Sequence, residues 1–502
     1  MYVNAWLIST ADSTLDQTRP GSHLASRPVL DRVELARLLL LSGSREYVGS
    51  RQRRDQEKWL RRRSPKENSR HEKEVMPTYI VEGGHSLSGR IRPAGNKNAA
   101  LPAIAATVMA SEPVTLQNIP KIGDVETLLE IVASLGAEVH WDDENTVTID
   151  ASSVSSGSVD RALSERIRAS LLLAGPLLAR FGKVDLPPPG GDVIGRRRMD
   201  THFLAFEALG ASVRLASGFE IEARDLKGAD FFLDEPSVTA TENAIMAAVL
   251  AKGESTIRNS ASEPHVQDLC HLLNKMGGGI EGIGTNQLRI SGVPELGGTV
   301  FAVGSDHIET GSFVGLAAVT GSEIMVENAP VEHLDSTLLG FRRLGVEVSI
   351  DGNTLTIHGD RTCNVASDAF GAVPKIDDGP WPAFPADLTS IAVVTATQCT
   401  GTVLVHEKMF ESRMFFTDKL VGMGAHIILC DPHRAVVVGP SVLQGTGLES
   451  PDIRAGMAML IAALGAQGTS RIQNVRQIER GYERIDERLR ALGARIELRD
   501  GP

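Results

Sequence analysis

The chain of 502 residues has few aromatic residues, no long apolar run and only four cysteines. Because 4% of the residues are aromatic, aliphatic side chains and alanine must form most of the core. The longest apolar stretches, residues 101–110 and 169–179, are too short to cross a bilayer. The N-terminus lacks the basic and apolar segments that are typical of a signal peptide. These absences predict a cytoplasmic protein without a membrane partner.

The cysteines, Cys270, Cys363, Cys399 and Cys430, have neither the spacing of metal ligands nor a disulfide pattern. We expect them to be scattered core thiols in a reducing compartment. The sequence contains no visible metal site, and no cofactor is expected.

The charge balance restricts the kind of partner. Lys and Arg together number 51 against 63 Asp and Glu, which gives a formal net charge of −12. Such an acidic chain does not offer the basic surface that a nucleic acid requires. A site for an anion must therefore be a local basic cluster. The length predicts two to four domains, at about 100–200 residues per domain.

Residues 1–75 differ from the rest of the chain. The stretch 51–73 (RQRRDQEKWLRRRSPKENSRHEK) is dense in charge and has almost no apolar period, which is typical of a disordered segment. Met76 then opens a strand-like segment, PTYIVEGG. We expect residues 1–75 to be a disordered N-terminal extension and Met76 to be the working start. A basic docking arm is the alternative interpretation of the extension.

Six similar units follow one another from residue 76 onward. In each unit an amphipathic helix ends in a Gly that precedes a β-type segment, as in SLGAEV at Gly136. The corresponding glycines of the other units are Gly210, Gly277, Gly345, Gly424 and Gly493. A left-handed residue is needed at such a helix end, and Gly adopts this conformation most easily. The units are about 70 residues long.

Each unit also contains an Ala-rich apolar helix and several short strands. Such helices are expected at 98–110, 168–180, 240–252 and 454–464, and strands at PVTLQN, STIRN, EIMVEN and TSRIQN. This order predicts an α/β fold with two similar domains of three units each and a cleft between them. We expect residues 76–96 and 305–502 to form one domain and residues 97–304 the other. The first strand, 79–83, is expected to pair with strands of the last units.

Positive charges recur where the apolar helices begin. Lys97 opens the first helix, Arg168 the second and Arg454 the sixth. Cations are unfavourable at a helix N-terminus, where free N–H groups point outward, unless an anion joins them. The repeated placement therefore predicts a phosphate or carboxylate site. For any single helix, ordinary capping with a surface arginine is the alternative.

The loop before the second helix of the second unit is also unusual. Gly190 and Gly191 permit a sharp bend or a close approach to a ligand. Asp192 follows them and precedes three consecutive arginines, 196–198, which repel one another unless an anion is present. A solvated basic loop is the alternative interpretation.

Several motifs are shared with a known family. They are KNAALP at 97–102, RAS at 168–170, GGDVIG at 190–195, DTH at 200–202, IETG at 308–311, PAFP at 382–385 and RGYER at 480–484. Together they resemble the UDP-N-acetylglucosamine 1-carboxyvinyltransferase family of enolpyruvyl transferases, from residue 76 to the C-terminus. The resemblance implies two inside-out α/β domains of three units each. It also implies that the enolpyruvyl group of phosphoenolpyruvate is joined to the 3'-hydroxyl of UDP-N-acetylglucosamine, by addition and then elimination of phosphate.

The resemblance implies roles for individual residues. Lys97, Arg197 and Arg480 are expected to hold phosphoenolpyruvate, and Asn98 to orient it. Asp387 lies at the family's sugar-hydroxyl position and is the expected base. The other implied binding residues are Arg168, Arg413 and Arg454 in a basic wall, Asp200, Thr201, Ser237, Val238 and Met409 at uridine- and phosphate-contacting positions, and Asp306 in the cleft.

Asp192 departs from the commonest family pattern. Many members carry Cys at this position as the general acid, and others carry Asp. An aspartate is ordinarily ionised at neutral pH and must gain a proton to serve as an acid. The nearby arginines oppose this, and bound phosphoenolpyruvate offsets them. We therefore expect Asp192 to be protonated mainly in the closed complex with both substrates. Because this position carries no thiol, resistance to the epoxide antibiotic fosfomycin is expected.

Three further residues depart from the family pattern. Arg198 stands where Pro is frequent and is expected to loosen the loop. His265 replaces a frequent acidic residue and His307 a common Arg, and we expect both to be ordinary core or surface histidines.

Two rival functions stay open at this point. The sister enzyme of aromatic synthesis uses phosphoenolpyruvate with shikimate 3-phosphate, but the NKNAALP and GGDVIG stretches favour the aminosugar. The second rival is a paralogue that binds the UDP-sugar without turnover, although Lys97, Asp192, Asp387 and Arg480 are all present. We expect a monomer.

Overall fold

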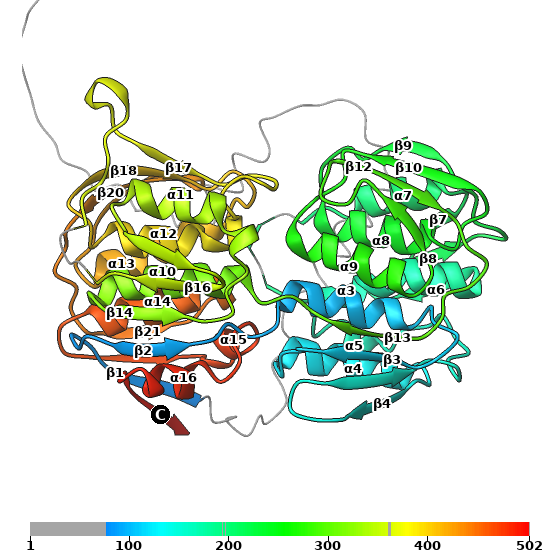
Figure 1. The fold of residues 1–502 in the computed structure, drawn as a ribbon, viewed down its shortest axis with the longest axis horizontal. Coiled ribbons are helices and arrows are strands. Elements are labelled where there is room, and N and C mark those ends of the chain that lie inside the picture. The colour runs from blue at the N-terminus through cyan, green and yellow to red at the C-terminus, as the bar shows by residue number, and fades with distance from the viewer. Residues whose placement is uncertain (1–76, 193, 196, 360–362, 501–502) are drawn as a thin grey trace, which may run out of the picture. The chain divides into compact units, whose positions relative to one another are not determined.

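The computed structural model describes residues 77–500 apart from 193, 196 and 360–362. The expectations for residues 1–75 therefore lie outside the described residues. The described residues form two lobes (Figure 1), each with its own hydrophobic core. One core extends from Ala99 to Val303 and belongs to what we call the central lobe. The other core combines residues 79–91 with residues 308–496 and belongs to the terminal lobe.

The central lobe contains short strands and short to medium helices. Its strands are β3 (Val114–Gln117), β4 (Glu138–Trp141), β5 (Val147–Asp150), β6 (Lys183–Leu186), β7 (Ser212–Leu215), β8 (Phe219–Glu222), β9 (Asp230–Phe232), β10 (Glu254–Arg258), β11 (Gly279–Glu281), β12 (Gln287–Ser291) and β13 (Thr299–Ala302). Its helices are α3 (Lys97–Thr107), α4 (Gly123–Ser134), α5 (Arg161–Ser164), the 3-10 helix η1 (Arg168–Leu173), α6 (Ala174–Phe181), α7 (Asp200–Ala208), α8 (Val238–Ala248) and α9 (Pro264–Lys275).

The terminal lobe has the same kinds of element. Its strands are β1 (Pro77–Glu82), β2 (Ser88–Ile91), β14 (Glu323–Val326), β15 (Val348–Asp351), β16 (Thr354–Ile357), β17 (Lys375–Asp377), β18 (Gly401–His406), β19 (His426–Asp431), β20 (Arg434–Gly439), β21 (Gly447–Glu449), β22 (Thr469–Gln473) and β23 (Arg495–Asp500). Its helices are α10 (His307–Thr320), α11 (Asp335–Arg343), α12 (Thr389–Ala396), α13 (Thr417–Gly422), α14 (Ile453–Gly465), α15 (Arg476–Glu479) and α16 (Ile485–Ala491), with the 3-10 helices η2 (Val331–His333), η3 (Ala369–Gly371), η4 (Ala386–Leu388) and η5 (Arg413–Phe416).

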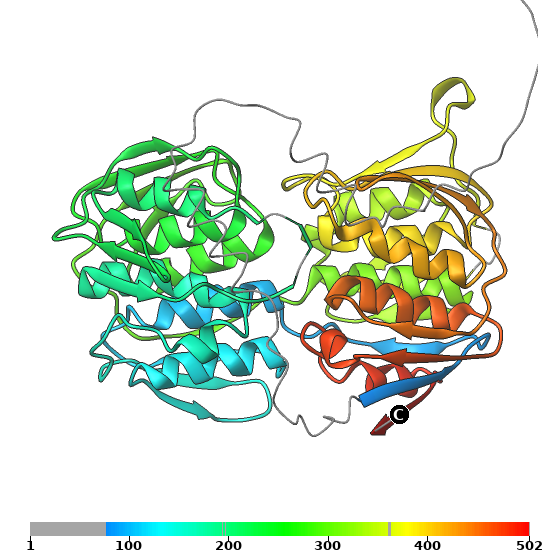
Figure 2. The same cartoon turned by 180° about the vertical axis from the view of Figure 1, so that it is seen from behind.

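The apolar helices form the inner layer of each lobe. In the terminal lobe, α10, α12 and α14 pack against one another and are buried on all sides. In the central lobe, η1 packs against α3, α6 and α8 in the same way. A helix that is apolar all round is stable only inside a core, which explains why the Ala-rich segments occupy this layer. Figures 1 and 2 show the sheets outside these helices, so the lobes are inside-out.

The sheets join strands of different units. β1 lies between β22 and β23 and is antiparallel to both, with Tyr79 opposite Ile472 and Leu498. The predicted pairing of the first strand with the last units is confirmed. The strand orders are β13-β3-β5-β4, β6-β8-β7 and β11-β12-β10-β9 in the central lobe and β21-β22-β1-β23, β15-β16-β14-β2 and β17-β18-β20-β19 in the terminal lobe.

The repeat predicted from the sequence is visible in the backbone. The six glycines at the helix ends all have a positive φ, between +84° at Gly345 and +108° at Gly136. The asparagines that end the strand motifs QN, RN, EN and QN are also left-handed, with φ between +56° and +61°. Asn tolerates this conformation better than other residues with a Cβ, which explains its recurrence at the same place in four units.

The helix expected at 168–180 is interrupted. Residues Arg168–Leu173 form η1, and α6 begins only at Ala174. The side chain of Asn243 bonds to the backbone of both η1 and α6. Its Oδ1 accepts from Gly175 N at 2.7 Å, and its Nδ2 donates to Leu171 O at 2.9 Å. These are the two backbone groups that would bond to each other in a continuous α-helix.

The expectation of scattered core thiols is wrong in two respects. Cys430 is exposed, and Cys399 lies beside Cys363, because the 363–364 segment runs next to residues 399–400. None of the four cysteines forms a disulfide bond. Within the described ranges, no cluster of three His, Cys, Asp or Glu side chains could hold a metal ion, and no helix is long and apolar enough to span a membrane.

Candidate active site

A cavity of about 280 Å³ is lined by residues of both lobes. It gathers most of the residues that the sequence marks as site residues, although they come from segments that are far apart in the chain. Those that line it are Lys97, Asn98, Arg168, Asp192, Arg197, Val238, Asp387, Met409, Arg413, Arg454 and Arg480. The expected cluster of cations therefore surrounds a single cavity, which carboxylates such as Asp124, Asp192 and Asp387 also line.

Four of the expected site residues do not line this cavity. Asp306 caps α10, because its Oδ1 accepts from Ile308 N at 2.7 Å and from Glu309 N at 2.9 Å. Thr201 is buried and donates to Asp234 at 2.7 Å. The remaining two are Asp200, which is exposed beside Arg198, and Ser237, which occupies the N-cap position of α8.

An ion-pair chain connects the two lobes inside the cavity. Lys97 Nζ lies 2.8 Å from Asp124 Oδ2, and Arg480 Nε lies 2.7 Å from Asp124 Oδ1. The same guanidinium reaches Asp192, with Nη1 at 2.7 Å from Oδ1. Lys97, Asp124 and Asp192 belong to the central lobe, whereas Arg480 follows α15 in the terminal lobe. Lys97 and Arg480, two of the three cations expected to bind phosphoenolpyruvate, are thus each paired with a carboxylate.

Asp124 and its cationic partners shift one another's pKa values within this chain of ion pairs. Burial raises the pKa of Asp124, but Lys97 and Arg480 outweigh it and leave the pKa below its usual range. Burial lowers the pKa of Lys97, and Asp124 opposes that effect only in part. Because this ion pair is shielded from solvent, removal of one partner would leave the charge of the other buried without a counter-ion, which is unfavourable.

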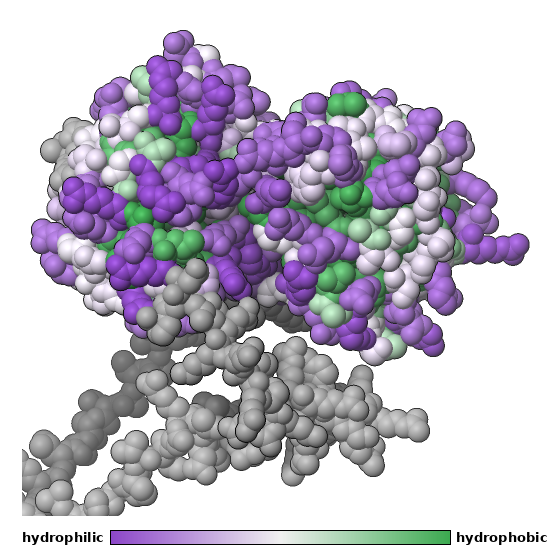
Figure 3. All heavy atoms as spheres, turned by 90° about the horizontal axis from the view of Figure 1, so that it is seen from below, coloured by the Kyte–Doolittle hydropathy of each residue, from purple (hydrophilic) through white to green (hydrophobic). Residues whose placement is uncertain are grey.

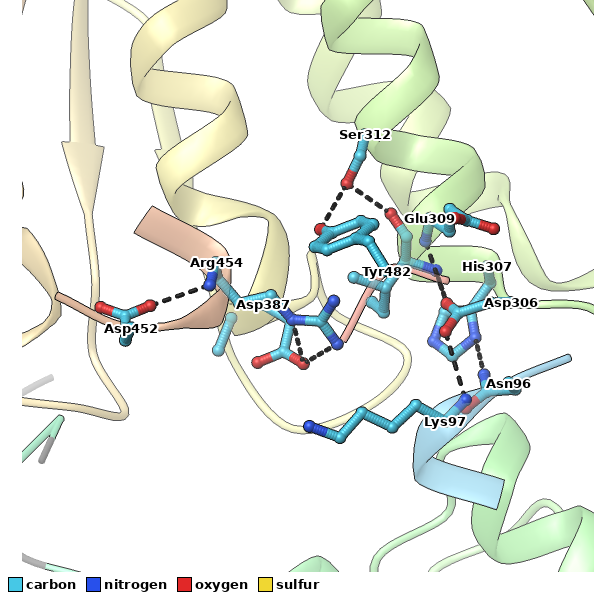
Figure 4. A network of polar contacts seen from close by, with 12 residues as sticks. Asn96, Lys97, Asp306, His307, Glu309, Ser312, Asp387, Asp452, Arg454 and Tyr482 are labelled. Carbon is cyan, nitrogen blue, oxygen red and sulfur yellow. Dashed lines mark hydrogen bonds and ion pairs between the residues drawn. The ribbon is translucent and has the colours of Figure 1, made fainter. Parts of the chain in front are cut away.

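Asp387 is clamped by two arginines. Its Oδ1 lies 2.9 Å from Arg413 Nη1, and its Oδ2 lies 2.9 Å from Arg454 Nη2 (Figure 4 shows the latter contact). Burial raises the pKa of Asp387, but the two guanidinium groups hold it well below the usual range. In this arrangement Asp387 is a carboxylate with little tendency to accept a proton.

Arg168 and Arg197 differ from the other cations of the cavity. Among the described residues neither forms an ion pair, and Arg168 Nη2 donates to the backbone oxygen of Arg197 at 3.1 Å. Burial, and then the charge of Arg197, lowers the pKa of Arg168 to about 10. Two guanidinium groups without a carboxylate partner in a half-closed site favour an anion as ligand.

The glycines of the Asp192 loop are required by their surroundings. A Cβ on Gly190 would lie 1.8 Å from the backbone oxygen of Glu165, and Gly191 has a φ of +98°. Further along the loop, the backbone oxygen of Ile194 accepts from Ser412 N of the terminal lobe at 3.2 Å. The loop therefore folds tightly against Arg168 and spans the cavity to the other lobe.

Comparison with known proteins agrees with this geometry. The family model described as EPSP synthase (3-phosphoshikimate 1-carboxyvinyltransferase) matches residues 81–489. The chain belongs to the EPSP synthase family. It is 60% identical to a UDP-N-acetylglucosamine 1-carboxyvinyltransferase of Bradyrhizobium diazoefficiens, over 83% of this chain and 97% of that protein. It is 55% identical to the protein of the same name from Treponema denticola, over 85% of this chain and 100% of that protein.

Solved structures of the EPSP synthase family share the fold. The enolpyruvyl transferase NikO from Streptomyces tendae superimposes with a TM-score of 0.77 at 24% identity, over 85% of this chain and all of that one. An EPSP synthase from Acinetobacter baumannii gives a TM-score of 0.65 at 18% identity, with the same coverage. The fold class and the family resemblance expected from the sequence are confirmed.

The cavity contains residues that the sequence analysis missed. Asp124 follows Gly123 in the first turn of α4 and lines the cavity. A carboxylate is favourable in the first turn of a helix, so the sequence alone does not distinguish it from an ordinary helix-start residue. Asp452, which caps α14 by accepting from Arg454 N at 2.9 Å, also lines the cavity.

Two histidines, both expected to be ordinary core or surface residues, are buried in the wall of the cavity. His265 and His307 line the cavity and stack with ring centroids 6.2 Å apart. Burial lowers the pKa of each imidazole to about 3. Figure 4 shows His307 beside Asn96, whose Nδ2 lies 2.9 Å from its Nδ1. Arg198, which is expected to loosen the loop, pairs with Asp234 at 2.7 Å.

Proposed function

We propose that this chain transfers the enolpyruvyl group of phosphoenolpyruvate to the 3'-hydroxyl of UDP-N-acetylglucosamine and releases phosphate. This is the first committed step of peptidoglycan precursor synthesis in the family that the chain resembles. The observation that carries the proposal is the convergence of Lys97, Arg197 and Arg480 on one cavity. The names of relatives that are 55–60% identical support the aminosugar as acceptor.

Phosphoenolpyruvate binding exchanges ion pairs. Its phosphate and carboxylate require several cations, and Arg168 and Arg197 offer guanidinium groups without carboxylate partners among the described residues. Lys97 and Arg480 already contact Asp124 and must share their charge with the incoming anion. Asn98 lies at the cavity wall beside Lys97 and orients the substrate.

Asp192 supplies the proton in the addition step. The sugar oxygen attacks C2 of phosphoenolpyruvate, and the methylene carbon C3 takes up a proton, which gives a tetrahedral ketal. Nη1 of Arg480 lies 2.7 Å from Oδ1 of Asp192. The substrate anion competes with Asp192 for this guanidinium. In the elimination step C3 loses a proton, the C2–O bond to phosphate breaks and the double bond forms again.

Asp387 accepts the proton of the sugar hydroxyl. It is a weak base while Arg413 and Arg454 clamp it. Substrate anions that draw either arginine away raise its basicity, so that the base becomes effective only after phosphoenolpyruvate has bound. Val238 and Met409 line the same cavity and contact the nucleotide part of the acceptor. For the remaining implied residues, Asp200, Thr201, Ser237 and Asp306, we propose an indirect role through the elements they cap or support.

A phosphate-release assay on the full chain tests the proposed function. With phosphoenolpyruvate and UDP-N-acetylglucosamine, we expect phosphate release by the wild type and a loss of at least about 100-fold in Lys97→Ala. Release with shikimate 3-phosphate instead of the aminosugar would assign the sister reaction. Binding of the UDP-sugar without phosphate release would assign the paralogue without turnover.

The two hydrophobic cores also suggest how the chain divides into domains. We propose domain boundaries at 97 and 304, so that residues 76–96 with 305–502 form one domain and 97–304 the other. The division of the hydrophobic core supports this.

We also propose a cytoplasmic monomer that binds no nucleic acid. On the face seen in Figure 3, hydrophilic side chains surround small separate hydrophobic areas, which is typical of a surface without a large partner.

A further inference from the structure

Three shielded polar atoms in the cavity wall have no hydrogen-bond partner within the part of the chain that the structure describes. They are Oε1 of Glu242, Oε2 of Glu263 and Nδ1 of His265. All three residues line the cavity. A shielded polar atom without a partner is unfavourable, and a ligand that supplies the missing bond removes this disadvantage.

Regular elements hold these three residues in place. Glu242 lies one turn into α8 and is 1% exposed. Glu263 occupies the N-cap position of α9 without making a side-chain capping bond, and its Oε1 accepts from Trp381 N at 3.5 Å. His265 lies in the first turn of α9 and stacks on His307 of the terminal lobe. The groups are therefore fixed before any ligand arrives.

The three groups differ from the cationic residues of the same cavity. Burial, and then the charge of Glu263, raises the pKa of Glu242, and burial raises the pKa of Glu263. No described cation forms an ion pair with either carboxyl group. Carboxyl and imidazole groups can exchange hydrogen bonds with neutral donors and acceptors. Such groups match hydroxyl and amide groups, whereas Lys97 and Arg197 match anions.

We propose that Glu242, Glu263 and His265 form a subsite for the uncharged sugar part of the acceptor, where they exchange hydrogen bonds with its hydroxyl and acetamido groups. This inference rests on the proposed function and specifies how the acceptor is recognised. The subsite separates the two substrates within one cavity: the cations bind phosphoenolpyruvate and the diphosphate, and the wall formed by Glu242, Glu263 and His265 binds the sugar.

Calorimetric titration of the full chain with UDP-N-acetylglucosamine and with UDP tests this subsite. Glu242→Ala is expected to weaken binding of UDP-N-acetylglucosamine about 10-fold and to leave UDP within about 2-fold. Glu242→Gln keeps a donor and an acceptor in the same place, and it is expected to stay within about 3-fold of the wild type for both ligands. Glu263→Ala provides a second variant with the same expected pattern, should Glu242→Ala fail to fold.

Cys270→Ala is the matched control. Cys270 is buried close to Glu242 but does not line the cavity, so its removal alters local packing without removing a polar cavity atom. We expect no change in either affinity. Equal weakening of UDP and UDP-N-acetylglucosamine, unchanged sugar binding in Glu242→Ala, or a Gln variant as weak as the Ala variant would each overturn the subsite. A wild-type chain that binds neither ligand contradicts the proposed function instead.

Discussion

Nη1 of Arg480 lies 2.7 Å from Oδ1 of Asp192, across the boundary between the two lobes. The guanidinium proposed to bind the substrate anion is therefore paired with the proposed acid. Substrate binding affects this contact, because an anion that occupies Arg480 competes with Asp192 for the guanidinium. The contact also ties the Asp192 loop to the terminal lobe before substrate is present.

Replacement of Asp192 separates acid catalysis from reaction with an epoxide. In Asp192→Asn, which cannot deliver a proton, phosphate release is expected to fall at least about 100-fold. In Asp192→Cys, a thiol can serve as the acid, and activity is expected to remain within about 10-fold. Fosfomycin is expected to leave the mass of the wild type unchanged and to add one molecule to Asp192→Cys. A covalent adduct on the wild type with loss of activity contradicts the role of this position.

Replacement of Asp124 is expected to shift the pH profile. The carboxylate of Asp124 opposes the lowering of the Lys97 pKa by burial. In Asp124→Asn, Lys97 loses its proton at a lower pH, so the alkaline limb of kcat/KM for phosphoenolpyruvate should move down by about one pH unit or more. Glu144→Gln breaks an exposed ion pair with Arg484 between the lobes and is the control, with an unchanged profile expected. An alkaline limb that stays in place in Asp124→Asn would show that Lys97 does not depend on this carboxylate.

Replacement of Asn243 is expected to destabilise the central lobe. Asn243→Ala leaves Gly175 N and Leu171 O without their side-chain partner in a region where Asn243 itself is 0% exposed. The free energy of unfolding should fall by about 2–4 kcal/mol. The control is Asn274→Ala, since Asn274 is only partly buried and its side chain bonds to the backbone N and O of Ile280. Water can replace those bonds, and a loss of about 1 kcal/mol or less is expected. Equal losses in both variants would refute the role of burial.

Much of the fold was predictable because it depends on local rules that recur six times. The helix-ending glycines need a left-handed backbone, and the apolar helices need burial on all sides, so both leave a periodic trace in the sequence. The interruption of the helix expected at 168–180 leaves no periodic pattern in the sequence. It depends on Asn243, which is distant in sequence and reads as an ordinary residue near a helix start.

Some residues of the candidate site could be predicted because their charge is unfavourable at their position in a helix. Lys97, Arg168 and Arg454 at helix starts are examples, and all three line the cavity. Asp124 and Glu242 were not marked as site residues, because a carboxylate near a helix N-terminus is locally favourable and needs no ligand to explain it. Their importance arises only from burial and from neighbours in the folded chain, such as Arg480 beside Asp124 and Glu263 beside Glu242.

Glu407 is expected to make stability depend on pH. It is 0% exposed directly after β18, and burial raises its pKa to about 9 although Arg413 opposes this. A carboxyl group with a raised folded-state pKa retains a proton that the unfolded chain has lost. Its contribution to stability is therefore complete below about pH 4 and declines as the pH rises toward about 9, by up to about 1.4 kcal/mol per pH unit.

Thermal unfolding from pH 6 to pH 9 measures this effect. Glu407→Gln removes the titration, so its Tm should exceed that of the wild type by an amount that grows as the pH rises. The exposed Glu449→Gln is the control and should follow the wild type at every pH. Parallel Tm curves for Glu407→Gln and the wild type would mean that the unfolded and folded chains bind the proton of Glu407 equally.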